Sequence, residues 1–452
     1  MQLRHWQESC ASLALQKFQR KQKHFLALAT PGAGKTVMAA VVAKRLFEAN
    51  EIDYVVCFAP SVAVLNSMRS TFSTVLARPM HGQLGAAGGV FTYQYLASSK
   101  TADWSFLRTS RVFIVFDEIH HCGGDKPEMA NTWGREVLIN LGAHAKFILS
   151  MTGTPWRSDL APITLASYLE PDKMIRCDYV YGIYDAIKDG VCRLPEVVLI
   201  DNDKLQVNEE AFSSLATAMA NSELKYSELL IDKQAVRYLL KTAVKQLIIA
   251  RQEQPNAAGL VVASSVHEAA NIRHILESEF NQTTVMVSYR ETDPQTVIER
   301  FRTSDTQWIV SVTMISEGTD IPRLRVCAHL SLVRTELFFR QVLGRILRMM
   351  PNILNKKAWL ISFAEKSLLE FAQRLQQDIP EQIVRFEKQE SPSEPGQQFS
   401  DEACNSSAQK DKTLTSSKNW SVNSQVPANV LSNSGLLFSL QGSYRQKVFS
   451  IF

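Results

Sequence analysis

The strongest chemical signal in this 452-residue sequence is a run of small residues that ends in lysine and threonine. It reads Ala29-Thr30-Pro31-Gly32-Ala33-Gly34-Lys35-Thr36, after an apolar run and before a helical pattern. In that context successive backbone N–H groups can surround a phosphate chain, and the helix N-terminus adds a favourable dipole. Lys35 would supply charge to the β- and γ-phosphates, and the Thr36 hydroxyl could ligate Mg²⁺. The segment predicts a P-loop, with Ala29 in place of the usual first glycine, rather than a simple glycine turn, which has no need of Lys-Thr.

Two adjacent carboxylates directly follow another apolar run, Val112–Phe116. If that run is a strand of the same parallel sheet, Asp117 and Glu118 lie at the carboxyl edge that also carries the P-loop. Asp117 would then hold Mg²⁺, directly or through water, and Glu118 would orient and deprotonate an attacking water. The alternative is a solvated strand end. The His-His-Cys run at 120–122 lacks the ligand spacing of a zinc site.

Gln341, Arg345 and Arg348 are spaced so that they share one face of an expected helix. A guanidinium presented across a cleft would stabilise the charge of a transferring phosphoryl group, an effect worth about 10³- to 10⁵-fold in rate. Hydrolysis would then require two lobes to close on the nucleotide. A basic, solvated helix face is the alternative.

Short apolar runs that alternate with amphipathic stretches must position these residues. We expect strands at Phe25–Ala29, Tyr54–Phe58, Val112–Phe116, Phe147–Met151, Val197–Ile200, Leu260–Ala263, Thr284–Val287, Trp308–Val312 and Val326–Leu330. We expect helices at Thr36–Ala49, His267–Glu279 and Asp293–Phe301, with a polar helical stretch over 207–252. This alternation predicts an α/β fold with two parallel sheets, each covered by helices.

The expected regions are a first lobe over 1–175, a connector with a helical stretch over 176–255, a second lobe over 256–387 and a low-complexity tail over 388–452. Within the tail, Ser391–Ser434 is rich in polar residues and proline, and it cannot bury enough apolar surface to offset its chain entropy. We therefore expect a disordered tail. The apolar segments Leu436–Leu440 and Val448–Phe452 could instead dock on the folded part.

The composition, 45% hydrophobic and 21% charged, is that of an ordinary globular protein of two or three domains. The net charge of +4 is too small to establish a nucleic-acid partner by itself. Seven scattered cysteines without a Cys-x-x-Cys pair argue against a disulfide framework and fit a cytoplasmic location. Neither a signal pattern nor a long apolar run is present, so we expect no membrane association.

Taken in order, these motifs resemble those of a superfamily 2 helicase with a box reading Asp-Glu-Ile-His. The P-loop is similar to the first motif of that family and Asp117–His120 to the second. Further resemblances lie at Leu3–Gln7, Phe58–Ser61, Phe91–Gln94, Thr152–Pro155, Ser316–Pro322 and Gln341–Arg348. The third motif, Thr-Gly-Thr-Pro-Trp-Arg, is most similar to the branch of DNA translocases and restriction-type motor subunits.

The resemblance implies two RecA-like lobes joined by a helical bridge, with ATP and Mg²⁺ bound between them. The resemblance also implies which residues contact the nucleotide, and Gln7 is expected to recognise adenine. These residues are Arg4, Gln7, Thr30, Pro31, Gly32, Ala33, Gly34, Lys35, Thr36, Gly318 and Asp320. The resemblance carries nucleic-acid contacts onto Pro60, Ser61, Thr92, Tyr93, Thr152 and Thr313. Trp156 and Arg157 could add contacts, although Trp156 could equally be a core residue.

Three functions stay open at this point. The first is an ATP-dependent DNA helicase or translocase, with DNA favoured over RNA. The second is the motor subunit of a restriction or defence complex with a nuclease or methyltransferase partner, since the sequence carries no nuclease motif of its own. The third is an ATP-gated nucleic-acid-binding switch, against which Glu118, Arg345 and Arg348 argue, because a pure switch need not retain them.

Overall fold

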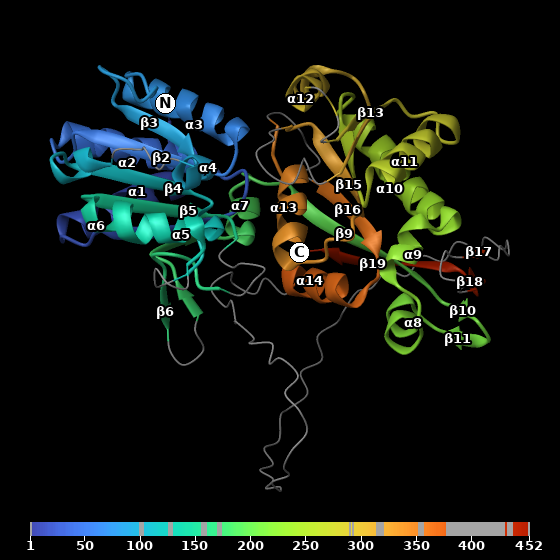
Figure 1. Ribbon diagram of the computed structural model, residues 1–452. Coiled ribbons are helices and arrows are strands. Elements are labelled where there is room, and N and C mark those ends of the chain that lie inside the picture. The colour runs from blue at the N-terminus through green and yellow to red at the C-terminus, as the bar shows by residue number, and fades with distance from the viewer. Residues whose placement is uncertain are drawn as a thin grey trace, which may run out of the picture.

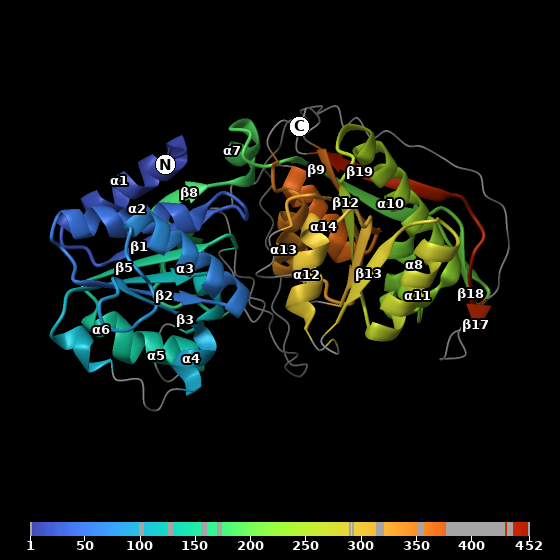
Figure 2. The ribbon, with the colours of Figure 1, turned by 90° about the horizontal axis from the view of Figure 1, so that it is seen from above.

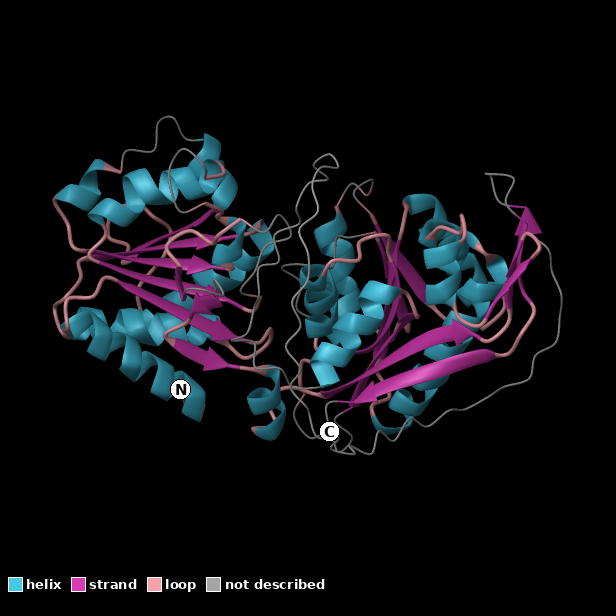
Figure 3. Ribbon diagram, turned by 90° about the horizontal axis from the view of Figure 1, so that it is seen from below, coloured by secondary structure: helices cyan, strands magenta, loops and turns pink. Residues whose placement is uncertain are grey.

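The structure, a computed structural model, describes residues 2–98, 104–124, 130–154, 161–169, 174–288, 291, 293–312, 321–350, 357–376, 430–431 and 437–450. They form two α/β lobes that lie side by side (Figure 1). In each lobe, helices lie on both sides of a central sheet (Figure 3). The predicted α/β class with two helix-covered sheets is confirmed. Among the helices that the structure describes, none combines the length and apolar character that a membrane crossing requires.

The sheet of the first lobe brings together the strands that lead into the expected chemistry. Its strands are β1 (His24–Ala29), β2 (Tyr54–Ala59), β3 (Gly88–Thr92), β4 (Val112–Asp117), β5 (Phe147–Thr152) and β8 (Tyr179–Tyr181). Their order is β3-β2-β4-β5-β1-β8, and every pair is parallel. All carboxyl ends therefore meet at one edge, which faces the second lobe (Figure 3).

Both faces of this sheet are buried, which explains why its strands read as continuous apolar runs. Along β1, Phe25 and Ala27 join one apolar cluster while Leu26 joins the other. The helices and the remaining strands of this lobe are α1 (His5–Gln19), α2 (Lys35–Glu48), α3 (Val62–Leu76), α4 (Tyr93–Ser98), η1 (Ser105–Arg108), η2 (Ile119–His121), α5 (Thr132–Glu136), η3 (Val137–Leu141), α6 (Gly142–His144), β6 (Ser167–Leu169), β7 (Met174–Arg176) and α7 (Ile183–Lys188).

The second lobe is built on a seven-stranded sheet of order β13-β14-β12-β15-β16-β9-β19. The strands are β9 (Leu194–Asn202), β12 (Ala258–Ala263), β13 (Thr284–Val287), β14 (Trp308–Ser311), β15 (Leu324–Leu330), β16 (Lys357–Phe363) and β19 (Tyr444–Ser450). All pairs are parallel except β19 with β9. The helices are α8 (Leu215–Asn221), α9 (Tyr226–Ile231), α10 (Lys233–Glu253), α11 (Val266–Ser278), α12 (Pro294–Thr303), α13 (Glu336–Ile346) and α14 (Lys366–Gln376).

The second lobe begins earlier than the expected boundary at residue 256. β9 falls within the region expected to be a connector, yet it pairs in parallel with β16 from Leu194 to Ile200. Residues expected to begin a helical stretch at 207 instead contribute to two strands, β10 (Leu205–Val207) and β11 (Glu210–Phe212). The partner strand of β9 lies about 160 residues away along the chain, so no local pattern could assign it to this sheet.

The expected disordered tail contains two strands that dock on the second lobe. β18 (Leu437–Leu440) pairs with β10, and β19 pairs with β9 from Tyr444 to Ser450; Figure 2 shows both in red along the second lobe. A short strand, β17 (Val430–Leu431), pairs with β18. The prediction of disorder is therefore wrong for residues 437–450. β19 covers an edge of β9 that would otherwise present unpaired N–H and C=O groups.

Candidate functional site

The expected phosphate loop joins β1 to α2 at the edge that faces the second lobe. Gly32 and Gly34 have φ values of +82° and +94°, which other residues rarely adopt. A Cβ on Gly34 would also lie 2.7 Å from Gln7 Nε2. The start of the loop is fixed by a hydrogen bond from Thr30 N to Tyr181 O (3.0 Å). The segment has the left-handed turns that a phosphate cradle uses, while phosphate binding itself stays a prediction.

The structure brings Lys35, Asp117 and Glu118 together. Lys35 is largely buried, and its Nζ donates to Ala29 O (3.0 Å) and lies 3.4 Å from Glu118 Oε1. Glu118 Oε2 accepts hydrogen bonds from Gly153 N (3.1 Å) and from the hydroxyl of Thr152 (3.1 Å). Two parallel strands and the P-loop thus deliver a cation and two carboxylates to one place, as the sequence predicted.

The surroundings push the pKa values of the two carboxylates in opposite directions. Burial, and then the charge of Glu118, raises the pKa of Asp117 to about 7, although Lys35 opposes this shift. Burial also acts to raise the pKa of Glu118. The charge of Lys35, the hydrogen bond with His120 and the N–H of Gly153 outweigh burial and hold the pKa of Glu118 well below its usual range. Glu118 is therefore ionised at neutral pH, whereas Asp117 keeps part of its proton there, and a nearby cation would favour its ionised form.

The residues present fit a Mg²⁺ ion that is held mainly by phosphates and water. Asp117 Oδ1 is buried without a hydrogen-bond partner among the described residues, which suits an atom that would meet a cation. The Thr36 side chain lines the same cavity as Asp117. Within the described ranges no three His, Cys, Asp or Glu side chains form a metal-binding group. One or two protein oxygens completed by substrate and water are the usual environment of Mg²⁺.

A cavity of about 480 Å³ lies between the lobes, and both lobes contribute to its wall. The first lobe contributes Arg4, Pro31, Gly32, Gly34, Lys35, Thr36, Asp117, Glu118 and others. The second lobe contributes Gln341, Arg345 and Arg348. The structure therefore gathers all three residues that were expected to cross the cleft at the same cavity as the P-loop.

Arg348 reaches this cavity by a different route from the one predicted. α13 ends at Ile346, and Arg348 lies beyond it in an isolated β-bridge with Cys192. The prediction that all three residues share one helix face is therefore wrong for Arg348. A Cβ on Gly32 would lie 3.2 Å from Arg348 Cγ, so the arginine side chain runs close over the P-loop. Burial, and then Arg302, lowers the pKa of Arg348 to about 10, which leaves it protonated at neutral pH.

Arg4 and Gln7 hold the P-loop from α1. Arg4 Nη1 donates to Ala33 O (2.6 Å), and Gln7 Nε2 donates to Gly34 O (3.0 Å). Gln7 Oε1 also accepts from Arg4 N (2.9 Å). Arg4 lines the cavity, whereas Gln7 is 4% exposed and does not. Gln7 thus holds the P-loop through its hydrogen bond to Gly34 O without lining the cavity, and its expected role in recognising adenine stays a prediction.

Two of the residues expected to contact nucleic acid, Tyr93 and Thr152, have fully buried side chains, and their contact with nucleic acid stays a prediction. Tyr93 packs beside Phe116, and its hydroxyl donates to Asp117 O (2.8 Å). Thr152 donates to Glu118 and lies 2.9 Å from His120 Nδ1. Both residues support the carboxylates from within the lobe.

Three other expected contacts are partly exposed at the carboxyl ends of β2 and β3. Ser61 caps α3 by accepting from Val64 N (3.4 Å), and Pro60 lines the cavity. Thr92 ends β3 and accepts from Tyr95 N (3.4 Å). The expected nucleic-acid contacts at Trp156, Arg157 and Thr313, and the expected nucleotide contacts at Gly318 and Asp320, lie outside the described residues.

The sequence reasoning missed three residues beside this site. His120 Nδ1 lies 3.4 Å from Glu118 Oε2, so it links the carboxylate to Thr152; its place in the Asp-Glu-Ile-His box was the available signal. Val62 (65% exposed) and Tyr95 (41% exposed) lie next to Ser61 and Thr92 on the outer surface. The helical turn after β3 exposes Tyr95 and buries Tyr93, a distinction that composition does not make.

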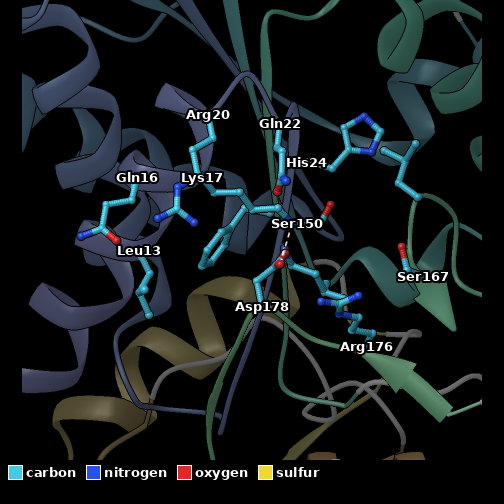
Figure 4. A pocket seen from close by; sticks show the side chains of 13 residues that line it. Leu13, Gln16, Lys17, Arg20, Gln22, His24, Ser150, Ser167, Arg176 and Asp178 are labelled. Carbon is cyan, nitrogen blue, oxygen red and sulfur yellow. Dashed lines mark hydrogen bonds and ion pairs between the residues drawn. The ribbon is translucent and has the colours of Figure 1, made fainter. Parts of the chain in front are cut away.

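A second cavity, of about 340 Å³, lies at the opposite end of β1 (Figure 4). Its charged groups include Lys17, whose Nζ donates to Asp178 Oδ1 (2.5 Å), while Asp178 Oδ2 accepts from Leu26 N (2.8 Å). This pair ties α1 to the sheet. None of the residues expected to carry chemistry lines this cavity, so we place the candidate site between the lobes.

Comparisons with known proteins agree with this architecture. Residues 1–157 match the family described as "Type III restriction enzyme, res subunit", and residues 240–350 match the "Helicase conserved C-terminal domain". An uncharacterized protein of Mycobacterium tuberculosis is 29% identical over 365 residues, and one of Mycobacterium leprae is 28% identical over the same length. Each alignment covers 76% of this chain but only 59% of the relative, so the chain spans about three fifths of the length of these relatives.

Two solved structures share the fold. A fragment assigned as the HsdR subunit of a type I restriction enzyme from Vibrio vulnificus superposes with a TM-score of 0.57 at 17% identity, covering 82% of this chain and 66% of that one. The ATP-dependent type ISP restriction-modification enzyme LlaBIII bound to DNA gives a TM-score of 0.50 at 14% identity, covering 80% of this chain and 27% of that one. With the two family matches in order along the two lobes, the chain is similar to the superfamily 2 helicases of the restriction-type branch.

Proposed function

We propose that this protein is a cytoplasmic, ATP-dependent DNA motor, a helicase or translocase, that hydrolyses ATP in the cavity between its lobes. The observation that carries the proposal is the shared wall of that cavity, to which one lobe brings Lys35 and Glu118 and the other brings Arg345. Hydrolysis in a cavity between two lobes depends on how closely the lobes approach each other, so each turnover would be coupled to lobe movement.

The residues of the first lobe bind the triphosphate and prepare water for attack. The N–H groups of the P-loop and the Lys35 ammonium neutralise the β- and γ-phosphates. Asp117 and Thr36 would hold Mg²⁺, which adds positive charge at the same phosphates. When phosphate draws Lys35 away from Glu118, the carboxylate loses a counter-charge, becomes more basic and can orient a water for in-line attack.

The residues of the second lobe meet the charge that develops on the γ-phosphoryl group. Arg345 and Arg348 are guanidinium donors, and Gln341 adds an amide on the same side of the cavity. Gly318 and Asp320 keep the nucleotide contacts that the family resemblance implies.

The DNA path we propose crosses the carboxyl ends of β2 and β3. Ser61 and Thr92 would contact phosphates there, and Thr313 would add a contact from the second lobe. The exposed side chains of Val62 and Tyr95 lie beside them and offer apolar and aromatic surface to bases.

The test is an ATPase assay over single-stranded, forked and duplex DNA and over RNA. We expect hydrolysis to rise with DNA. Glu118→Gln should abolish turnover while leaving ATP binding intact, and Lys35→Ala should weaken binding as well. Glu209→Gln, at an exposed glutamate in the turn between β10 and β11 that does not line the cavity, is the matched control. Hydrolysis that no nucleic acid stimulates would refute the motor, and ATP-dependent DNA binding with negligible turnover would instead support the switch.

A second candidate is the motor subunit of a restriction or defence complex. It is favoured by the match of residues 1–157 to the res-subunit family and by the additional length of the relatives, which the chain does not cover. A nuclease or methyltransferase that purifies with the native protein would support this candidate. A lone monomer that separates strands efficiently would favour the independent helicase.

A further inference from the structure

The segment that links the two lobes, which includes Cys192 and Arg193, contacts the P-loop of the first lobe and the end of α13 in the second. Cys192 forms a β-bridge with Arg348, and its Sγ lies 3.8 Å from Pro31 O in the P-loop. The next residue, Arg193, donates its backbone N–H to Leu347 O (2.7 Å). One residue later, Leu194 begins β9 and the sheet of the second lobe. The linker therefore runs between the P-loop and the arginine-bearing end of α13.

The side chain of Arg193 fastens that end of α13 to the sheet. Arg193 is fully buried, and its Nη1 donates to Ile346 O (3.1 Å) and to Leu324 O (2.7 Å). Its Nη2 donates to Pro322 O (3.0 Å). Ile346 is the last residue of α13, so the guanidinium meets the negative end of the helix dipole.

A planar guanidinium with five N–H donors can hold several carbonyls at fixed angles, which an ammonium cannot do. Burial, and then Arg325, lowers the pKa of Arg193 to about 9. The side chain is therefore still a cation at neutral pH. Arg345 lies one residue before the bonded carbonyl of Ile346, and Arg348 lies two residues after it.

We propose that Arg193 is a positioning residue, which fixes the end of α13 so that Arg345 and Arg348 face the P-loop at the distance hydrolysis needs. This inference rests on the proposed function. It implies that a change in the orientation of the first lobe reaches Arg345 and Arg348 through the segment that links the lobes. Arg193 itself does not line the cavity. Its substitution should therefore reduce kcat and leave the KM for ATP nearly unchanged.

The same lobe offers a matched control in Arg323. Arg323 is also buried and also binds carbonyls, donating to Phe301 O (2.8 Å), Thr306 O (2.8 Å) and Asn256 O (3.0 Å). None of these acceptors belongs to α13. Arg323→Lys therefore removes the same kind of buried anchor, and none of the carbonyls that Arg323 binds lies in the segment that carries Arg345 and Arg348.

The experiment compares Arg193→Lys and Arg323→Lys in the full chain by ATPase kinetics and by amide hydrogen exchange. For Arg193→Lys we expect kcat to fall by about 10- to 100-fold, the loss that a displacement of about 1 Å produces. The KM for ATP should change by less than about twofold, because uniform binding is retained. Amides at residues 343–348 should exchange about tenfold faster. For Arg323→Lys, faster exchange should be confined to the region of residues 301–306, with kcat kept.

Loss of protection throughout β12, β15 and β16 would show that Arg193→Lys unfolds the lobe. Arg193→Gln then replaces it, because a neutral amide leaves no unbalanced buried charge. Faster exchange at 343–348 with unchanged kcat would overturn the inference, and so would an equal loss of kcat in Arg323→Lys. Unchanged amide exchange at residues 343–348 in Arg193→Lys would also overturn the inference, whatever the kcat of that variant. Absence of DNA-stimulated hydrolysis in the unaltered chain would instead refute the proposed function, since the exchange result does not depend on turnover.

Discussion

Replacing Gly344 by alanine should disable hydrolysis without damaging either lobe. Gly344 lies in α13 beside Arg345, and a Cβ at this position would lie 2.7 Å from Pro31 Cβ and 3.0 Å from Pro31 Cγ. Carbon atoms pack favourably at about 3.5 to 4.0 Å. The added methyl group therefore pushes α13 away from the P-loop by roughly 1 Å.

The expected loss follows from this displacement. A misplacement of about 1 Å can cost about 100-fold in rate, so we expect kcat to fall by about that factor. Inside a helix, alanine is more stable than glycine by about 0.5 to 1 kcal/mol. The stability of the second lobe should therefore stay the same or rise while turnover falls.

The assay is steady-state ATPase activity at saturating DNA, measured together with thermal unfolding. Gly182→Ala is the matched control, because the nearest atom to its added Cβ is Asp185 Oδ2 at 4.0 Å. Wild-type kcat in Gly344→Ala would refute the reasoning, since hydrolysis would then not need this close approach of the lobes. A fall in kcat together with a lower melting temperature would also refute it, because the fold and not the interface would then be responsible.

Three further predictions concern DNA contact, the tail and pH. Tyr95→Ala should raise the DNA concentration for half-maximal stimulation by roughly 5- to 150-fold, because a base stacked on an aromatic ring contributes about 1 to 3 kcal/mol. Tyr54→Ala, at a residue with 42% exposure at the amino end of β2, should have no effect in the same titration. Tyr444→Ala removes a ring stacked on Tyr238 (centroids 4.0 Å apart) and should lower the free energy of unfolding by about 3 kcal/mol in urea; a change below about 0.5 kcal/mol would mean that β19 is not docked in solution. Burial lowers the pKa of His329 to about 4, whereas the pKa of histidine in the unfolded chain is about 6.5. The unfolded chain therefore binds the proton more tightly, and protonation favours unfolding. The free energy of unfolding should fall by roughly 3 kcal/mol between pH 6.5 and pH 4. Urea unfolding across this range should show a smaller fall in His329→Gln, and an identical fall in both proteins would contradict the assignment.

Much of the architecture could be predicted because its causes are local. The runs that became β1, β2, β4 and β5 are apolar at successive positions, which is what a strand buried on both faces requires. The helix after the P-loop was predicted to within one residue at each end. The boundaries that failed, at β9 and β19, depend on strand pairing across a large separation along the chain.

The residues of the candidate site likewise fall into those that the sequence placed correctly and those that it could not place. Lys35 and Glu118 were placed together correctly, because the P-loop that carries Lys35 follows β1 and Glu118 follows β4 in one parallel sheet. Tyr93 and Tyr95 could not be told apart from composition, because the turn that buries one ring and exposes the other depends on how α4 packs. His120 was missed because its partner Thr152 comes from a different strand.

The sequence by itself determined the strands β1, β2, β4 and β5, the loop after β1, the two carboxylates and the family resemblance, since each depends on residues that are close along the chain or on motifs in a fixed order. Only the tertiary structure decided that Arg348 leaves the helix of Arg345 and bridges to Cys192, and that Arg193 fastens the end of α13. The physical reason is that a buried guanidinium is stabilised by whichever carbonyls surround it, and those carbonyls come from segments that only folding brings together.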